Sequence, residues 1–179
     1  MNLQKTRRNN SKGNHTTNKV TTALFIIYLI AIFWILLFKL GVRFAYGGST
    51  SVNLIPFSEP IDRGEIILNV VIFVPLGIYA GVLFTKWSFG TKFLFIFLTS
   101  LMFEALQFIL RIGAFDITDI ITNILGGVIG LMIFKAIEEL FNNSVKAQEF
   151  INIIAVIGTV LMISLLLLLK MNMLPIRYQ

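Results

Sequence analysis

The sequence predicts an all-α polytopic membrane protein, a bundle of about five transmembrane helices. Hydrophobic residues make up 56% of the 179-residue chain and charged residues only 13%, whereas a typical soluble domain has about 25% charged residues. The apolar residues also occur in blocks of roughly 18 or more positions, the length at which a helix crosses the hydrocarbon core of a bilayer. Together these two observations leave little room for a soluble domain.

Five apolar blocks follow one another along the chain. Residues 1–19 are polar and basic, and we expect them to form a disordered cytoplasmic tail. The first block, 20–38, is longer than the apolar part of a usual secretory signal and is followed by Lys39, so we expect an uncleaved helix. The other blocks expected to span the membrane are 66–84, 93–110, 119–137 and 151–169. The fifth block looks featureless apart from Gly158, Thr159 and Ser164.

The intervals between the blocks are expected to be loops. The longest interval, 39–65, is punctuated by glycine and proline, and a short interfacial or re-entrant piece is expected around Asn53–Phe57, which includes Pro56. Pro75, two residues before Gly77, predicts a kink in the second helix. The polar stretch from Lys135 to Glu149 predicts a mixed-charge connection, so residues 138–179 would comprise a cytoplasmic connection, the fifth helix and a short tail.

The distribution of lysine and arginine predicts that the N-terminus lies inside and the C-terminus outside. This orientation puts nine of the 15 basic residues inside and six outside, and cytoplasmic loops carry the excess of positive charge. The inside set is Lys5, Arg7, Arg8, Lys12, Lys19, Lys86, Lys92, Lys135 and Lys146, and the outside set is Lys39, Arg43, Arg63, Arg111, Lys170 and Arg177. The Asn53 loop and the turn from Arg111 to Asp116 would then both face outward.

Composition also excludes several classes of function. The chain has no cysteine and a single histidine, so it offers no disulfide, no thiol nucleophile and no thiolate or imidazole metal site. That histidine, His15, is expected to be a solvated residue of the N-terminal tail. The net charge of +6 is scattered around the hydrophobic blocks, as membrane topology requires, and therefore does not predict a nucleic-acid partner. We expect no cofactor.

Polar side chains interrupt the third block and the turn that follows it. Glu104, Gln107 and Arg111 are spaced i, i+3 and i+7, which places them on one face of a helix. Arg111 can bind a carboxylate through two parallel hydrogen bonds, and Glu104, Asp116 and Asp119 are candidate partners. One arginine against three carboxylates leaves surplus negative charge, which a cation, a proton or a cationic ligand would relieve. The same groups could instead serve only to hold the helices together.

A second polar face is expected on the fourth helix. Asp119, Asn123, Gly126 and Gly130 recur at spacings of four, three and four residues, so they share one side of that helix. Gly126 and Gly130 form a GxxxG element, which lets another helix backbone approach closely. Because the preceding turn is short, the third and fourth helices must be antiparallel neighbours whose polar faces can meet. Asn69, about one turn into the second helix, could complete the lining.

These polar and glycine positions resemble the VanZ-like family of bacterial membrane proteins. The matching patterns are Asn53-x-x-Pro56-Phe57, Asn69-x-x-x-Phe73-x-Pro75-x-Gly77, Glu104-x-x-Gln107-x-x-x-Arg111, Asp116-x-x-Asp119-x-x-x-Asn123 and Gly126-x-x-x-Gly130. The resemblance covers about residues 25–137, which makes 20–137 a VanZ-like domain and leaves the tail and the fifth helix outside it. It implies a multi-pass protein of the cytoplasmic membrane. The member that gives the family its name is associated with low-level resistance to the glycopeptide teicoplanin.

Three functions are compatible with the polar residues, and the first is favoured. A non-enzymatic protein could bind or move an envelope molecule, such as a lipid head group, a cell-wall precursor or a glycopeptide-related molecule, in an outward-facing polar cleft. Its partners would include membrane lipids. Its substrate-binding residues would be Asn69, Glu104, Gln107, Arg111, Asp116, Asp119 and Asn123, with Asn53, Pro56, Pro75, Gly77, Gly126 and Gly130 as structural residues.

The two alternatives need more than the sequence offers. A metal-assisted enzyme acting on a lipid phosphate could use the three carboxylates as oxygen ligands. Against this, Arg111 competes for them, and no histidine or serine–base arrangement lies nearby. Proton-coupled transport could use Glu104 as the titrating group, but the internal repeats typical of transporters are missing.

Overall fold

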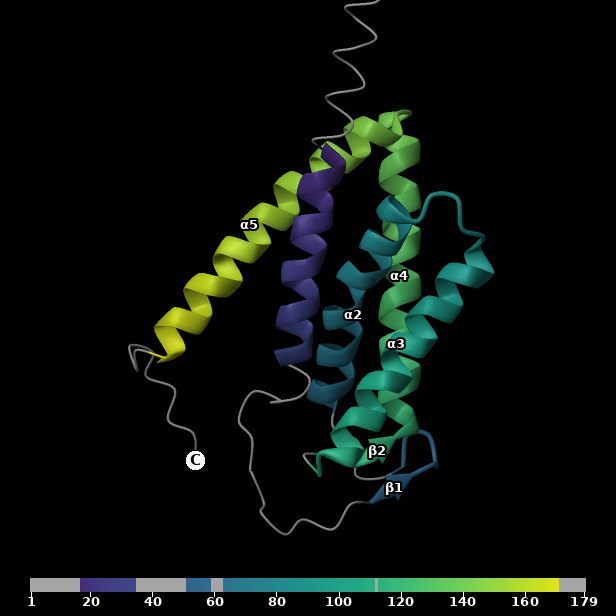
Figure 1. Ribbon diagram of the computed structural model, residues 1–179. Helices are drawn as coiled ribbons and strands as arrows, with labels where there is room; N and C mark the ends of the chain where they lie inside the picture. The colour runs from purple at the N-terminus through teal and green to yellow at the C-terminus, as the bar shows by residue number, and fades with distance from the viewer. Residues whose placement is uncertain (1–16, 35–50, 59–62, 112, 171–179) are drawn as a thin grey trace, which may run out of the picture. The chain divides into compact units, whose positions relative to one another are not determined.

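The computed structural model describes residues 17–34, 51–58, 63–111 and 113–170, and these residues form five helices and two very short strands (Figure 1). The helices are Thr17–Trp34, α2 (Arg63–Leu83), α3 (Phe89–Ile109), α4 (Ile117–Phe141) and α5 (Ser144–Lys170), and the strands are β1 (Val52–Asn53) and β2 (Phe115–Asp116). All five helices are long and apolar enough to cross a membrane. The prediction of an all-α multi-pass membrane protein is therefore confirmed. The predicted tail lies almost wholly outside the described residues.

The helices begin before the apolar blocks that predicted them, and α4 also continues beyond its block. α4 runs to Phe141 and α5 starts at Ser144, so the connection predicted from Lys135 to Glu149 is almost entirely helical. Lysine and glutamate are good helix formers, so charge alone does not end a helix. Only Asn142 and Asn143 join the two helices. The side chain of Asn143 starts α5 by accepting hydrogen bonds from two backbone N–H groups of its first turn, at 2.9 and 3.2 Å.

The chain divides into two compact units, one of residues 29–137 and the other of residues 1–28 with 138–179. Within the first unit, α2 and α4 meet backbone to backbone at glycines. A Cβ atom on Gly126 would lie 2.9 Å from the carbonyl carbon of Val70, and one on Gly130 would lie 2.9 Å from the nitrogen of Ile78 and 3.0 Å from the Cα of Gly77. Any larger residue would push the helices apart. The helix that the Gly126–Gly130 spacing brings close to α4 is thus α2.

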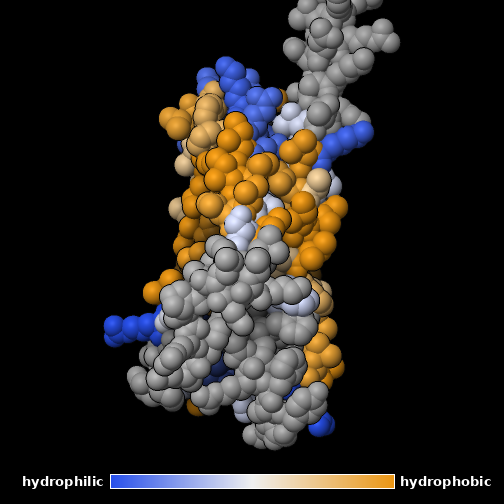
Figure 2. Space-filling model, turned by 90° about the vertical axis from the view of Figure 1, so that its left-hand side faces the viewer, coloured by the Kyte–Doolittle hydropathy of each residue, from blue (hydrophilic) through white to orange (hydrophobic). Residues whose placement is uncertain are grey.

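Aromatic and aliphatic side chains fill the remaining space of this unit. Phe73 and Leu76 of α2 and Ile96 of α3 are completely buried, and Phe73 packs edge to face against Phe103 with 6.4 Å between ring centroids. α2 continues through Pro75 as one helix of 21 residues. Large apolar side chains are exposed along each helix, and the coloured residues between the two ends of the face in Figure 2 are mostly hydrophobic, which suits contact with lipid.

In the second unit, the helix Thr17–Trp34 is joined to α5 by polar side chains. The Thr21 hydroxyl donates a hydrogen bond to Asn152 Oδ1 at 2.9 Å and accepts one from Gln148 Nε2 at 2.7 Å. Gln148 Nε2 also donates to Asn18 Oδ1 at 2.9 Å. The prediction of a featureless fifth helix was wrong at Asn152, because a single amide in an apolar block gives no periodic signal.

Candidate ligand-binding site in a buried polar network

Polar side chains of the β1 loop, α2, α3 and α4 gather within the unit of residues 29–137, and hydrogen bonds join several of these elements. We call this set the polar network; its members are Asn53, Ser58, Asn69, Ser100, Glu104, Gln107, Asp116, Thr118, Asp119, Thr122 and Asn123. Most are buried, including Glu104 at 3% and Asp119 at 7% exposure. Ionisable side chains inside a membrane domain are costly and mark functional sites by default. The network is therefore the candidate site.

Asp116 connects three parts of the network at the start of α4. β1 pairs with β2 in parallel, with Asn53 opposite Asp116, and Asn53 Nδ2 donates hydrogen bonds to Asp116 Oδ2 and Ser58 Oγ, both at 2.9 Å. Asp116 Oδ1 accepts from the backbone N–H of Thr118 at 2.7 Å, which makes Asp116 the N-cap of α4. The Asp116 N–H in turn donates to Glu104 Oε2 at 3.2 Å. One aspartate thus ties the β1 loop and α3 to α4.

The β1 loop is fixed to α4 by a second contact. The backbone N–H of Phe57 donates to Thr118 Oγ1 at 3.0 Å, and Asn53 Oδ1 accepts from the Ile55 N–H at 3.2 Å. Phe57 has a φ of 55°, a left-handed conformation that is uncommon for a bulky residue. The hydrogen bonds on both sides of it hold this turn in place.

Two hydrogen bonds donated by asparagine side chains lie deeper between the helices. Asn69 Nδ2 of α2 donates to Asp119 Oδ1 of α4 at 2.7 Å, a short bond to a carboxylate. Asn123 Nδ2, one turn further along α4, donates to Ser100 Oγ of α3 at 3.1 Å. Asn123 is 1% exposed, and its Oδ1 is the one buried side-chain atom in the described residues that has no hydrogen-bond partner. The helix interface therefore contains an acceptor that lacks a donor.

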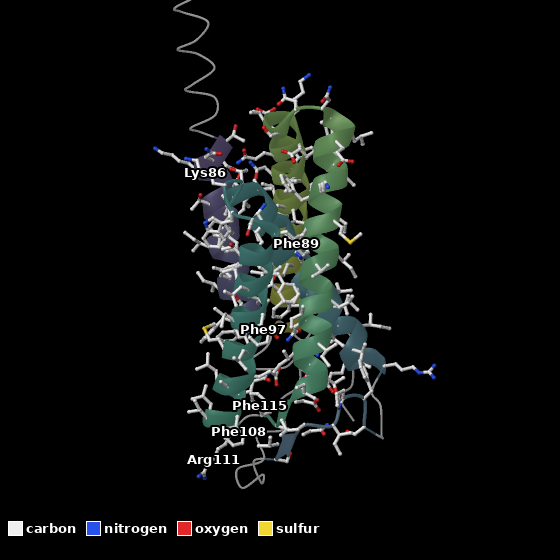
Figure 3. All side chains as sticks on the ribbon, turned by 90° about the vertical axis from the view of Figure 1, so that its right-hand side faces the viewer. Lys86, Phe89, Phe97, Phe108, Arg111 and Phe115 are labelled. Atoms are coloured by element: carbon white, nitrogen blue, oxygen red, sulfur yellow. The ribbon has the colours of Figure 1, made fainter. Side chains whose placement is uncertain are left out.

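The structure does not bring Arg111 into this network. The i+7 spacing assumed a helix, but α3 ends at Ile109 and Arg111 has a φ of 55°. Its side chain is exposed and points away from the ribbon (Figure 3). Within the described part of the chain it forms no salt bridge with Glu104, Asp116 or Asp119, so the predicted ion pair is a wrong expectation. The chain reverses its direction after α3, and this reversal points the guanidinium of Arg111 outward.

The other predicted site residues divide between the network and its surroundings. Gln107 is 4% exposed, and its side chain lies under the turn that follows α3, where a Cβ on Gly113 would be 3.8 Å from its Oε1. Pro56 is exposed in the β1 loop. Gly77, Gly126 and Gly130 belong to the α2–α4 packing rather than to the network, and Pro75 is a half-buried residue inside α2.

Sequence reasoning missed the hydroxyl members of the network. Ser100 precedes Glu104 by four residues and so occupies the same helix face. Thr118 and Thr122 have the same spacing, and Thr122 Oγ1 donates to the Thr118 carbonyl at 2.9 Å. Helical spacing could have identified all three.

The carboxylates are not arranged as metal ligands. In the part of the chain that the structure describes, no group of three or more His, Cys, Asp and Glu side chains could hold a metal ion. The chemistry that the arrangement offers is hydrogen bonding and charge: ionised carboxylates only accept hydrogen bonds, and the donors to them here include amides and backbone N–H groups.

Comparison with known proteins places this network within a matched region. The chain matches the family described as VanZ/LLP1 over residues 25–142. It is also similar to Protein VanZ of Enterococcus faecium, with 38% identity over 151 residues that cover 82% of this chain and 91% of that protein. No solved structure matches the chain. The family match contains every member of the polar network, whereas α5 lies outside it.

Proposed function

Since this chain belongs to the VanZ/LLP1 family, we propose that it is a multi-pass protein of the bacterial cell membrane that binds or moves an envelope molecule. The ligand carries a cationic group, such as the amine of a lipid head group or of a cell-wall precursor, and the polar network binds that group. The resemblance to the family adds a link to glycopeptide susceptibility, with teicoplanin as the compound to test.

The observation that carries this proposal is the grouping of three carboxylates in a membrane domain. Glu104 and Asp119 are buried, and the backbone of Asp116 is hydrogen-bonded to Glu104. A carboxylate at the centre of a membrane helix costs about 2.5–3.5 kcal/mol on insertion scales, and this figure is an upper bound here because Asp119 lies in the first turn of α4. If these side chains served only to hold the helices together, three ionisable groups would not be needed. An ammonium group, which has three donors, matches both the charge and the acceptors.

Asn123 supports the same class of ligand. Its Oδ1 is a buried acceptor that no donor of the described residues reaches, and such an atom costs roughly 1–3 kcal/mol. A ligand that brings N–H or O–H groups would offset this cost. A purely anionic ligand would not.

The site is proposed to open on the outer side of the membrane. The Asn53 loop and the residues after α3 lie at the same end of the unit as the start of α4 (Figure 1). The count of basic residues along the sequence supports this orientation, because the intervals expected inside carry the excess of lysine and arginine. Envelope precursors and glycopeptides are exposed on that side.

The test replaces the carboxylates without changing their size. Glu104→Gln and Asp119→Asn should each reduce the teicoplanin resistance of a bacterium expressing the protein to that of the same bacterium with an empty vector. Glu149→Gln is the matched control, because Glu149 is an exposed carboxylate outside the network, and it should behave as wild type. Immunoblots of membrane fractions must show equal protein levels. Full resistance with both network variants would refute the proposed role of the carboxylates.

The two alternative functions are not proposed. The metal-assisted reaction needs several side chains that coordinate the same metal ion, and the described residues contain no such group of His, Cys, Asp and Glu. Proton-coupled transport needs a titrating Glu104, and no further observation favours it over ligand binding.

A further inference from the structure

The turn after β1 exposes apolar side chains at the end of the unit where the polar network begins. Leu54 is 63% exposed, Ile55 69% and Phe57 47%. Soluble proteins rarely expose a cluster of large apolar side chains without a partner. The segment 51–58 also carries no charged residue. These side chains therefore need an apolar environment.

Polar contacts fix the backbone of this turn while its side chains point outward. Asn53 binds Asp116 and the Ile55 N–H, and the Phe57 N–H is bound to Thr118. The turn keeps the left-handed φ of Phe57, a conformation that costs about 1–3 kcal/mol. The exposure of Leu54, Ile55 and Phe57 is thus a property of a fixed turn.

Helix length places the turn at the boundary between hydrocarbon and water. α3 has 21 residues and is about 31 Å long, close to the thickness of a hydrocarbon core, about 30 Å. If Phe89 lies at one boundary, Ile109 lies at the other. β2 follows α3 after a short turn, and β1 is paired with β2. The turn that follows β1 is therefore at the depth of the lipid head groups.

An exposed guanidinium lies at the same end. Arg111 follows Ile109 and Leu110, which are 70% and 53% exposed, and its side chain points away from the helices (Figure 3). The described residues give it no carboxylate partner. Arginine binds phosphate groups through two parallel hydrogen bonds, and apolar residues flanked by a cation are typical of segments that lie in the membrane interface.

We propose that Leu54, Ile55, Phe57 and Arg111 form an interfacial anchor that binds the phospholipid leaflet at this end of the protein. The apolar side chains enter the hydrocarbon boundary, and Arg111 binds lipid phosphate. This assigns Arg111 to the membrane and not to the ligand of the polar network. It also means that the polar network reaches the depth of the lipid head groups. This inference goes beyond the proposed function and does not depend on it.

Spin labelling tests the depth of the turn, because the chain contains no cysteine and one introduced thiol gives one label. Ile55→Cys in the full-length protein, labelled with a nitroxide in lipid nanodiscs, should be relaxed more by oxygen than by a water-soluble nickel chelate. Leu98→Cys, on the exposed face near the middle of α3, is the lipid reference. Ser144→Cys, at the exposed first residue of α5, is the water reference. A label at residue 55 that behaves like the one at 144, or that neither reagent reaches, would overturn the proposal.

Lipid composition tests the role of Arg111. Nanodiscs that contain phosphatidylglycerol should raise the thermal midpoint of the wild-type protein above its value in phosphatidylcholine alone. Arg111→Gln should reduce this difference at least twofold, whereas Arg111→Lys should reduce it less, because the charge remains although the two parallel hydrogen bonds are lost. An undiminished difference in Arg111→Gln would show that the guanidinium does not bind the leaflet. Neither experiment involves the carboxylates, so failure here leaves the proposed function to its own test.

Discussion

Replacing Gly130 with alanine should destabilise the unit of residues 29–137, because the new methyl group would collide with the backbone of α2. An ideal Cβ at this position would lie 2.9 Å from the nitrogen of Ile78 and 3.0 Å from the Cα of Gly77, and closer still to the carbonyl oxygen of Val74. If the atoms that face the new methyl group belonged to a side chain, that side chain could rotate away. The backbone of a packed helix cannot. The two helices must therefore move apart.

The size of the effect follows from two opposing contributions. Overpacking costs about 1–3 kcal/mol, and contact with backbone atoms puts Gly130→Ala at the upper end. Alanine also favours the helix over glycine by about 1 kcal/mol. The net loss is about 2 kcal/mol, which lowers the thermal midpoint by about 4–8 °C for a chain of this size.

Gly158 of α5 provides the matched control for this substitution. A Cβ there would meet nothing within 4 Å, so Gly158→Ala should gain only the helix propensity and raise the midpoint by about 2–4 °C. Both variants are heated in nanodiscs, and the midpoint is read from the loss of the monodisperse size-exclusion peak. Shifts of the same sign and size for the two variants would refute the reasoning from backbone contact.

Two further pairs of substitutions test the polar contacts. Asn69→Leu should lower the free energy of unfolding by about 1.5–3 kcal/mol, because Asp119 loses a charge-assisted hydrogen bond. Asn123→Leu should cost less, because one polar atom of Asn123 already lacks a partner; equal losses in the heating assay would contradict this ranking. Thr21→Val should cost about 1 kcal/mol by removing the hydroxyl that binds α5 and should speed amide exchange in the first helix. Thr22→Val, where the hydroxyl makes only a local bond, is the control and should leave exchange unchanged.

The helices could be predicted from the sequence because a long apolar segment has few ways to satisfy its backbone in lipid. An isolated segment must form a helix, whatever its neighbours. Hydropathy therefore found all five, but it placed the start of every helix too late and the end of α4 too early. The residues from Lys135 to Phe141, three of them charged, continue α4, since a helix can extend beyond the hydrocarbon core where water solvates its side chains.

The site was predicted less completely. Helical spacing put Asn69, Asp119 and Glu104 in one neighbourhood, and the structure brings these residues into one network. The position predicted for Arg111 was wrong because helical spacing applies only within a helix, and α3 ends before Arg111. The strands β1 and β2 were not predicted, since two residues show no periodicity. Their pairing, which brings Asn53 to Asp116, joins segments 63 residues apart.

The sequence by itself determined that this is a membrane bundle with a family-specific set of polar residues, because hydropathy and helical spacing are local properties of the chain. Only the tertiary structure decided how those residues are used. Which backbone Gly126 and Gly130 approach, which amide binds Asp119, and whether Arg111 turns inward all depend on where the helices end and which faces meet. Those outcomes are set by contacts between distant segments, and no single stretch of the chain encodes them.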